Sequence, residues 1–195
     1  MTDRILPSKA ILRDADLAAS KLSWRDLDAA IDRGELERIA PGTYARIGLV
    51  DDDSASLASI ALRRPSATIC LTSALDRHDL TDAIPSRIDV AVPRGARPLK
   101  APYSKIAWHY FAADTFAIGR DQVEIIDDIF IGLYNAQRTI VDAFRLRHLI
   151  GADTATEALK RWLRMSGSQP SELLKMAKSF PKALPKLRNA LEVML

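Results

Sequence analysis

Residues 22–48, LSWRDLDAAIDRGELERIAPGTYARIG, constrain the fold of this chain more than any other stretch. Ser23 is a good helix N-cap, and Asp26, three residues later, completes a weaker form of the capping box. Gly34 supplies the left-handed residue that ends a helix. The segments ELERIA and TYARIG then flank Pro41-Gly42, a dipeptide that favours a turn. The stretch therefore predicts a helix that ends at Gly34 and a two-stranded hairpin after it.

A shorter helical segment is predicted before this one. Residues 4–21 have a helical pattern, in which Asp14 can cap the segment DADLAASKL and Leu17 lies on its buried side. Lys21-Leu22 then fills a tight connection. Helix, tight turn, helix and hairpin follow one another in a winged helix-turn-helix, whose second helix enters the DNA major groove while the hairpin lies against the backbone or minor groove.

A helical wheel divides the second helix into an apolar side and an open side. The apolar side holds Trp24, Leu27, Ala30 and Ile31, and the open side holds Arg25, Ala29 and Arg33. The small alanine lets the helix approach a groove, and the arginines beside it can reach phosphates or a guanine edge. The helix N-terminus can hold a phosphate. The residues predicted to contact DNA are Lys21, Ser23, Arg25, Ala29, Arg33, Arg38, Thr43, Tyr44 and Arg46.

A second interpretation of the same helix stays open. Asp26, Asp28 and Asp32 lie on it and would repel phosphates. An arginine on the open face of a helix is usually only solvated, and helix-turn-helix look-alikes are common. A winged helix that binds protein instead of DNA is therefore the competing hypothesis.

The remaining segments predict a mixed sheet and a helical C-terminal part. Aspartates 51–53 mark a boundary and cap the helix that follows. Apolar or alternating segments predict strands in ATICLTS, RIDVAVP and SKIAWHY, and Asp127-Asp128 reads as the turn of a hairpin. Helices are expected in SALDRHDL, AQRTIVDAFRLRHL, residues 153–165 and residues 170–193, the last interrupted by prolines. The predicted class is α+β, with a winged helix-turn-helix domain in residues 1–50 and a mixed-sheet domain with C-terminal helices in residues 51–195.

Composition is that of a soluble globular protein. Hydrophobic residues make up 48% and charged residues 27% of the 195 residues. No apolar run is long enough for a membrane-spanning helix, and the N-terminal segment lacks the features of a secretory signal. Cys70 is the single cysteine, which excludes an internal disulfide. We therefore expect a cytoplasmic protein with no membrane partner.

The positive charge lies toward the C-terminal end. The net charge is +3. Residues 1–50 carry eight basic and eight acidic side chains, whereas residues 151–195 carry eight basic and four acidic ones. The basic residues of the C-terminal part are Lys160, Arg161, Arg164, Lys175, Lys178, Lys182, Lys186 and Arg188. If they lie on the same side as the hairpin, they can add phosphate contacts that weaken steeply with salt.

No catalytic residue, metal site or cofactor is predicted. His78, His109 and His148 stand in separate segments without metal-ligand spacing, and each reads as a packed or surface residue. Cys70 reads as a buried, inert thiol. Asp89 resembles a nuclease carboxylate, but the Glu-x-Lys set that a Mg²⁺ nuclease needs does not follow it. A nuclease or another hydrolase built on the C-terminal sheet stays only as a third hypothesis.

Several motifs together resemble the AbiEi antitoxins of AbiE-type, or type IV, toxin–antitoxin systems. The N-terminal motif is LAASKLSWRDLDAAIDRGELERIAPGTYAR, with its glycine, leucine and arginine before a Pro-Gly-x-Tyr wing. TSALDRHDLTDAIPSRIDVAVPRG resembles the family's Ser-Ala-Leu helix and the strand after it. NAQRTIVDAFR resembles its Arg-Thr-x-x-Asp helix, here Arg138, Thr139 and Asp142, of which Asp142 most simply pairs with Arg138 one turn earlier. The resemblance covers about residues 10–180, and the order and spacing of the motifs are fairly specific.

The resemblance implies an antitoxin that neutralises a nucleotidyltransferase toxin and represses its own operon by binding inverted repeats in the promoter. The partners implied are double-stranded DNA and the toxin, and no enzymatic activity is expected. The family's antitoxic part is the C-terminal domain, and a stable complex with the toxin is not required. The alternative is an antitoxin that masks its toxin directly, with the winged helix as a scaffold. This chain departs from the family in its acidic second helix and in a first helix that is short.

Overall fold

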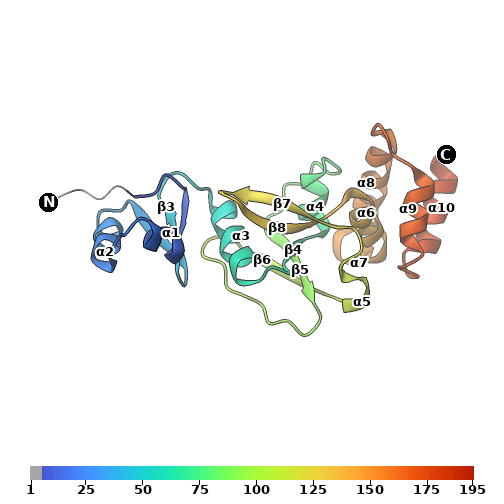
Figure 1. Ribbon diagram of the computed structural model, residues 1–195. Helices are drawn as coiled ribbons and strands as arrows, with labels where there is room; N and C mark the ends of the chain where they lie inside the picture. Colours follow the sequence, from blue (N-terminus) through green and yellow to red (C-terminus); the bar gives the residue numbers. More distant parts are fainter. Residues whose placement is uncertain (1–5) are drawn as a thin grey trace. The chain divides into compact units, whose positions relative to one another are not determined.

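The computed structural model describes residues 6–195, which form two compact units (Figure 1). The first unit comprises the described residues up to Pro65, with residues 99–105 and 123–131. The second comprises residues 66–98, 106–122 and 132–195. The described chain contains ten helices and two sheets, so the predicted mixture of α and β structure is confirmed. The first unit contains the described part of residues 1–50 and adds three later segments to it.

The first unit carries a three-stranded antiparallel sheet with the strand order β1-β3-β2. Its elements are β1 (Ile11–Arg13), α1 (Asp14–Ala19), α2 (Trp24–Asp32), β2 (Leu36–Ala40), β3 (Thr43–Arg46) and α3 (Asp52–Arg63). The hairpin between β2 and β3 turns at Gly42, which has a positive φ of 65°. A side chain at this position would also meet the Asp14 carboxylate, because an added Cβ would lie 2.5 Å from Asp14 Oδ2.

The local signals around α2 act as predicted. The Ser23 hydroxyl accepts from the Asp26 amide at 3.3 Å, and the Asp26 carboxylate accepts from the Ser23 amide at 2.8 Å. These two bonds form the capping box that starts the helix. After α2, Gly34 adopts a φ of 72°, the left-handed conformation that ends it. Asp51 likewise caps α3, because its carboxylate accepts from the Ser54 amide at 2.8 Å.

The segment before α1 differs from the prediction. Residues 11–13 form β1 instead of continuing a helix, and they pair with β3 in the register Ile11 to Ala45. Residues 4 and 5 of the predicted helical segment lie outside the described residues. The helix starts at Asp14, where the Asp16 carboxylate accepts from the Arg13 amide at 2.9 Å. Pairing with a distant strand has overridden the local helical preference.

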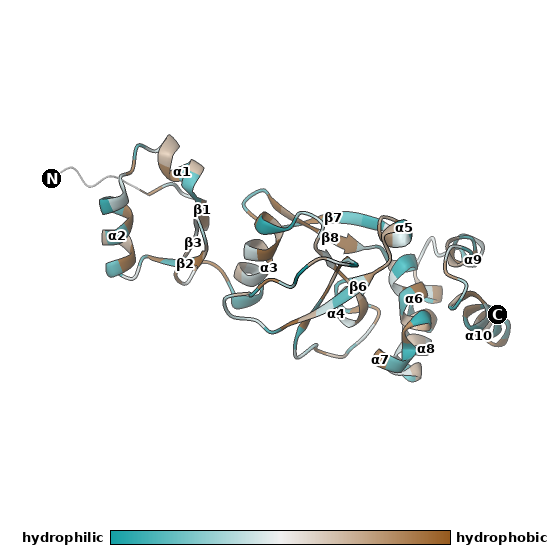
Figure 2. Ribbon diagram, turned by 90° about the horizontal axis from the view of Figure 1, so that it is seen from below, coloured by the Kyte–Doolittle hydropathy of each residue, from teal (hydrophilic) through white to brown (hydrophobic). Residues whose placement is uncertain are grey.

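Six buried side chains form a hydrophobic cluster in the first unit. They are Leu12, Leu17, Leu27, Ala30, Leu36 and Tyr44. Leu17 is buried as predicted, and so are two residues of the apolar side of α2. Trp24 contradicts the wheel, because it is 68% exposed. Trp24 is the first residue of α2, and the buried residues of this helix, Leu27 and Ala30, come later along it. Figure 2 shows hydrophilic and hydrophobic segments along α2.

The second sheet is mixed and has the strand order β6-β5-β4-β8-β7. Its strands are β4 (Thr68–Ile69), β5 (Ile88–Pro93), β6 (Ile106–Phe111), β7 (Arg120–Ile126) and β8 (Ile129–Tyr134). β4 pairs antiparallel with β5 and parallel with β8, while β5 and β6 are parallel. β7 and β8 are joined through Asp127 and Asp128, which both have positive φ. The predicted hairpin turn is therefore confirmed.

The helices of the second unit build an extensive hydrophobic core. They are α4 (Leu71–Arg77), α5 (Ala113–Phe116), α6 (Ala136–Arg145), α7 (Arg147–Ile150), α8 (Ala152–Arg164), α9 (Pro170–Ala177) and α10 (Leu184–Met194). Figure 1 shows α6 beside α8, and α9 beside α10. Trp162, Leu173, Phe180 and Leu187 are among the buried members of this core. Within the described residues, none of the helices has the length and apolar character that crossing a membrane requires.

Candidate nucleic-acid interface

The open side of α2 carries the predicted contact residues. Arg25 and Arg33 are exposed, and Ala29 between them is half-buried. Successive residues four apart in a helix differ by about 40° around the axis, so the three lie along one face. The two arginines span about 12 Å of helix at 1.5 Å per residue.

Arg25 in α2 and Arg33 at the C-terminal end of this helix differ in their surroundings. The Arg33 guanidinium donates to both carboxylate oxygens of Glu35, at 2.6 and 3.2 Å. This hydrogen bond lowers the pKa of Glu35. Within the described chain, Arg25 makes no hydrogen bond or ion pair. A phosphate would therefore compete with Glu35 for Arg33, but it would meet no such competitor at Arg25.

One of the acidic side chains of α2, Asp26, is hydrogen-bonded within the N-terminal cap of the helix. The Asp26 carboxylate accepts from the Ser23 amide and, at 2.7 Å, from the Ser23 hydroxyl. The predicted phosphate contact by Ser23 would therefore compete with this bond. Asp28 and Asp32 remain exposed on the helix. These two carboxylates are the groups that oppose binding of a polyanion.

Two of the four predicted hairpin contacts are buried, and a third, Arg46, is partly exposed but bound to the backbone. Thr43 and Tyr44 are only 4% and 3% exposed, because β3 is the central strand between β1 and β2. Burial raises the pKa of the Tyr44 phenol, and the nearby Asp14 adds to the shift. The Arg46 guanidinium donates to two backbone carbonyls, of Pro7 at 2.6 Å and of Lys9 at 3.0 Å. Arg46 therefore ties the N-terminal segment to the sheet.

Two further predicted residues remain on the surface. Arg38 is exposed on β2, and it makes no hydrogen bond or ion pair with any residue that the structure describes. Lys21 is exposed in the turn between α1 and α2, where it adopts a φ of 53°. Together with Arg25 and Arg33, they are the basic side chains of the predicted DNA contacts that are exposed on the first unit.

The basic C-terminal residues belong to the second unit. Arg161 is engaged there, because it forms ion pairs with Asp82 and with Glu157. Lys175 Nζ lies 3.5 Å from Oε2 of Glu172, three residues earlier on α9. Ion pairs with nearby carboxylates therefore partly neutralise the positive charge of these residues.

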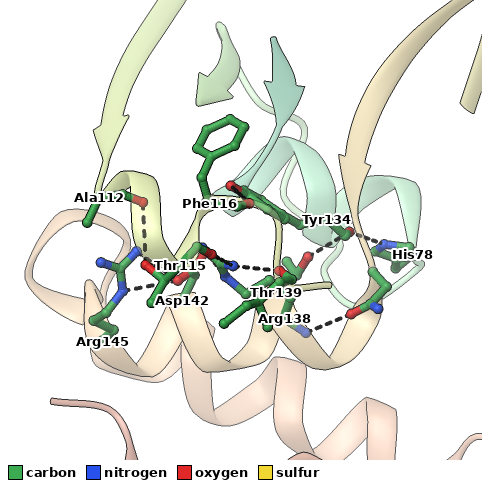
Figure 3. A network of polar contacts seen from close by, with 11 residues as sticks. His78, Ala112, Thr115, Phe116, Tyr134, Arg138, Thr139, Asp142 and Arg145 are labelled. Atoms are coloured by element: carbon green, nitrogen blue, oxygen red, sulfur yellow. Dashed lines mark hydrogen bonds and ion pairs between the residues drawn. The ribbon is translucent and has the colours of Figure 1, made fainter. Parts of the chain in front are cut away.

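The Arg-Thr-x-x-Asp motif forms a buried network in the second unit (Figure 3). Arg138 and Asp142 are both fully buried, and Arg138 Nε donates to Asp142 Oδ2 at 2.9 Å. The predicted pairing is thus confirmed. Arg145 adds a second cation, donating to Asp142 Oδ1 at 3.0 and 2.8 Å. Arg138 Nη1 donates to the carbonyl oxygens of Thr115 and Ile118 at 2.7 and 2.6 Å.

Aromatic rings enclose the cations of this network. The Arg138 guanidinium lies 4.2 Å from the Tyr134 ring centroid and 4.3 Å from that of Phe180. Arg145 lies 4.7 Å from the Phe111 ring centroid. Among the described side chains, Arg138 Nη2 is the buried polar atom without a hydrogen-bond partner, and the ring faces are the groups that stabilise its charge. The charged groups of this network contact one another, backbone carbonyls and ring faces, so we interpret the network as a structural element.

Most of the histidines, and the single cysteine, have structural surroundings. His78 Nε2 donates to the Tyr134 carbonyl oxygen at 2.7 Å, and His148 is exposed. Cys70 is fully buried, and burial raises the pKa of its thiol well above the usual range, so the thiol stays protonated. His109 Nε2 lies 2.8 Å from Asp89 Oδ1. Within the described residues, no cluster of three His, Cys, Asp or Glu side chains can hold a metal ion.

Comparison with known proteins identifies a similar fold. No family model and no curated protein sequence matches the chain. Among solved structures, the fold is similar to the crystal structure of RV2827C protein from Mycobacterium tuberculosis, with a TM-score of 0.51 and 20% sequence identity. The match covers 97% of this chain and 78% of that chain. At this identity the similarity concerns the fold, because function depends on the residues of a site.

Proposed function

We propose that the protein is an antitoxin of a type IV toxin–antitoxin system, which neutralises a nucleotidyltransferase toxin and represses its own operon. The first unit acts as a winged helix-turn-helix that binds inverted repeats in the promoter. The observation that carries this proposal is the open face of α2, along which Arg25 and Arg33 are separated by a rise of about 12 Å and are both exposed. The hairpin of β2 and β3 follows directly and presents Arg38 as the wing contact.

The two arginines make different contributions in this proposal. Arg25 is available for a phosphate or a base edge, whereas Arg33 must exchange Glu35 for DNA. A bidentate contact from arginine to guanine contributes about 1–3 kcal/mol to discrimination. Arg25 is therefore the main contact, and Arg33 is the secondary one. Asp28 and Asp32 keep the affinity low, so binding is strongest at low salt.

The test is a gel shift with a duplex from the chain's own promoter. We expect the wild-type protein to shift this duplex at low salt, and Arg25→Ala combined with Arg33→Ala to abolish the shift. Binding weakens as salt rises, and each phosphate contact adds about 0.9 to the steepness of log K against log salt. Loss of both arginine contacts should therefore make the salt dependence of any residual binding shallower by about 1.8. Glu35→Gln should tighten binding, because it removes a negative charge beside Arg33.

The matched control is Arg94→Ala, which removes one exposed arginine of the second unit. It should leave the shift unchanged, while circular dichroism shows that all variants keep their helix content. A double variant that folds and still shifts the promoter as strongly as the wild type would refute the assignment of α2.

A second candidate function is direct masking of the toxin, and one observation favours it. Trp24 is 68% exposed beside an apolar hollow of about 120 Å³ lined by Leu17, Leu22 and Leu27. Exposed aromatic side chains next to an apolar hollow are common at the centres of protein interfaces. In this candidate the first unit contacts the toxin through Trp24.

The masking hypothesis predicts that Trp24→Ala abolishes co-purification with the neighbouring nucleotidyltransferase and leaves promoter binding unchanged. Truncating an aromatic hot spot weakens an interface by about 2 kcal/mol or more, which is about thirtyfold in affinity. Leu195→Ala is the control, because it trims another exposed apolar side chain far along the sequence. Toxin that fails to co-purify with the wild-type protein would exclude masking and leave the autorepressor proposal standing.

A further inference from the structure

The second unit contains a cavity of about 180 Å³ that the proposed function does not use. We propose that this cavity binds a small zwitterion of the α-amino acid class with an aliphatic side chain. Asp89 would receive the ammonium group, and Arg87 would receive the carboxylate. The proposal concerns the second unit and does not rest on DNA binding by α2.

The floor of the cavity is an oriented carboxylate. Asp89 is 6% exposed, and its Oδ1 lies 2.8 Å from His109 Nε2 on the neighbouring strand. In the register of β5 and β6, His109 is opposite Ala91, so the pair lies diagonally on one face of the sheet. The Asp89 backbone is also held, because its amide donates to Ser73 Oγ at 2.9 Å and its carbonyl accepts from the Cys70 amide at 3.0 Å. The carboxylate is thus positioned before any ligand arrives.

The rim of the cavity carries the opposite charge. Arg87 also lines the cavity and lies in the bend just before β5, two residues ahead of Asp89, so the chain brings the guanidinium and the carboxylate to the same cavity. No ion pair joins Arg87 to Asp89, and the Arg87 guanidinium makes no hydrogen bond with another described residue. An α-amino acid carries its two charges on adjacent carbons, so it can span such a pair. A bidentate arginine contact suits its carboxylate.

The walls of the cavity are aliphatic. Leu71, Leu149 and Ile150 line it, and Leu149 is 55% exposed although it is a large apolar residue. Thr72 and Ser86 add two hydroxyl groups that can donate to a carboxylate. An apolar wall with a few convergent polar groups is the usual composition of a small-ligand site. The wall predicts an aliphatic side chain on the ligand.

Two other classes of ligand fit this cavity less well. A simple oxyanion such as phosphate would meet the Asp89 carboxylate at the floor, which repels it. A metal ion lacks a third protein ligand among the described residues. A zwitterion satisfies the carboxylate and the guanidinium together.

Isothermal titration calorimetry with L-leucine, L-isoleucine, L-valine and L-alanine tests the proposal on the full chain. We expect L-leucine to bind, and leucine amide and 4-methylpentanoate, which each lack one charge, to bind about ten- to hundredfold more weakly. Thermal unfolding should show a matching rise in Tm with L-leucine alone among these three compounds. Inorganic phosphate should not bind.

Arg87→Ala is the main variant, because Arg87 is exposed and its loss leaves the core intact. It should weaken L-leucine binding by a similar factor, whereas Arg97→Ala, an exposed arginine outside the cavity lining, should not. Asp89→Asn tests the floor in the same way. Absence of binding by all four amino acids, equal binding of the singly charged analogues, or an unchanged affinity in Arg87→Ala would each overturn the proposal.

Discussion

Asp142→Ala should destabilise the protein by about 3–5 kcal/mol, because it leaves two buried or half-buried arginines without their shared carboxylate. Asp142 accepts from Arg138 Nε at Oδ2 and from two nitrogens of Arg145 at Oδ1. Arg138 is 0% exposed, so water cannot replace the lost partner. Urea unfolding followed by circular dichroism measures the change as a lower transition midpoint.

Two further variants separate charge from packing in this network. Asp153→Ala removes an exposed carboxylate from the first turn of α8 and should cost less than about 1 kcal/mol. Arg138→Met combined with Asp142→Leu removes both buried partners of the innermost pair. This double variant should be less destabilised than Asp142→Ala, because the fully buried charge at position 138 is removed and only the partly exposed Arg145 loses its carboxylate partner. Equal stability of Asp142→Ala and the wild type would show that the network is not a stabilising element.

Phe180→Ala is expected to cost a similar 3–5 kcal/mol, as is usual for truncation of a buried phenylalanine. Phe180 is 3% exposed, lies between α9 and α10, and its ring faces Arg138 at 4.3 Å and Arg145 at 5.7 Å. The alanine variant therefore leaves a cavity and also removes the ring that contacts the guanidinium groups of Arg138 and Arg145. We expect a lower urea midpoint and faster proteolytic cleavage between α9 and α10.

Phe180→Leu distinguishes the two contributions, because leucine fills most of the volume but has no ring face. It should lose only about 1–2 kcal/mol, the range of a desolvated cation–π contact. Val193→Ala trims a side chain that is 87% exposed and should change stability by less than about 0.5 kcal/mol. A leucine variant as unstable as the alanine variant would assign the whole effect to the ring, and an alanine variant as stable as the wild type would contradict the packing described for Phe180.

Local chemistry explains which elements could be predicted. Caps and turns depend on residues a few positions apart, so Ser23, Gly34 and Asp51 marked helix ends correctly. The pairing of Arg138 with Asp142 is equally local, because it joins residues one helical turn apart. The enclosure of Arg138 by Tyr134 and Phe180 involves a different strand and a distant loop, and no periodicity in the sequence indicates it.

The candidate interface shows the same division. An open helix face follows from the wheel, and Arg25 and Arg33 are exposed as expected. Trp24 was assigned to the apolar side but is exposed, because a wheel gives the direction of a side chain and not how far the core extends along the helix. Thr43 and Tyr44 were predicted to be wing contacts because the sequence does not indicate that a third strand pairs with β3.

The amino-acid sequence by itself determined the mixture of helices and strands, the start and end of α2, the turns of both hairpins and the short-range ion pair of α6. The tertiary structure alone decided that residues 11–13 join a sheet, that Arg46 binds the N-terminal backbone, and that Arg87 and Asp89 share a cavity. The physical reason is range: caps and turns are stabilised by neighbours along the chain, whereas burial and strand pairing depend on segments brought together only by folding.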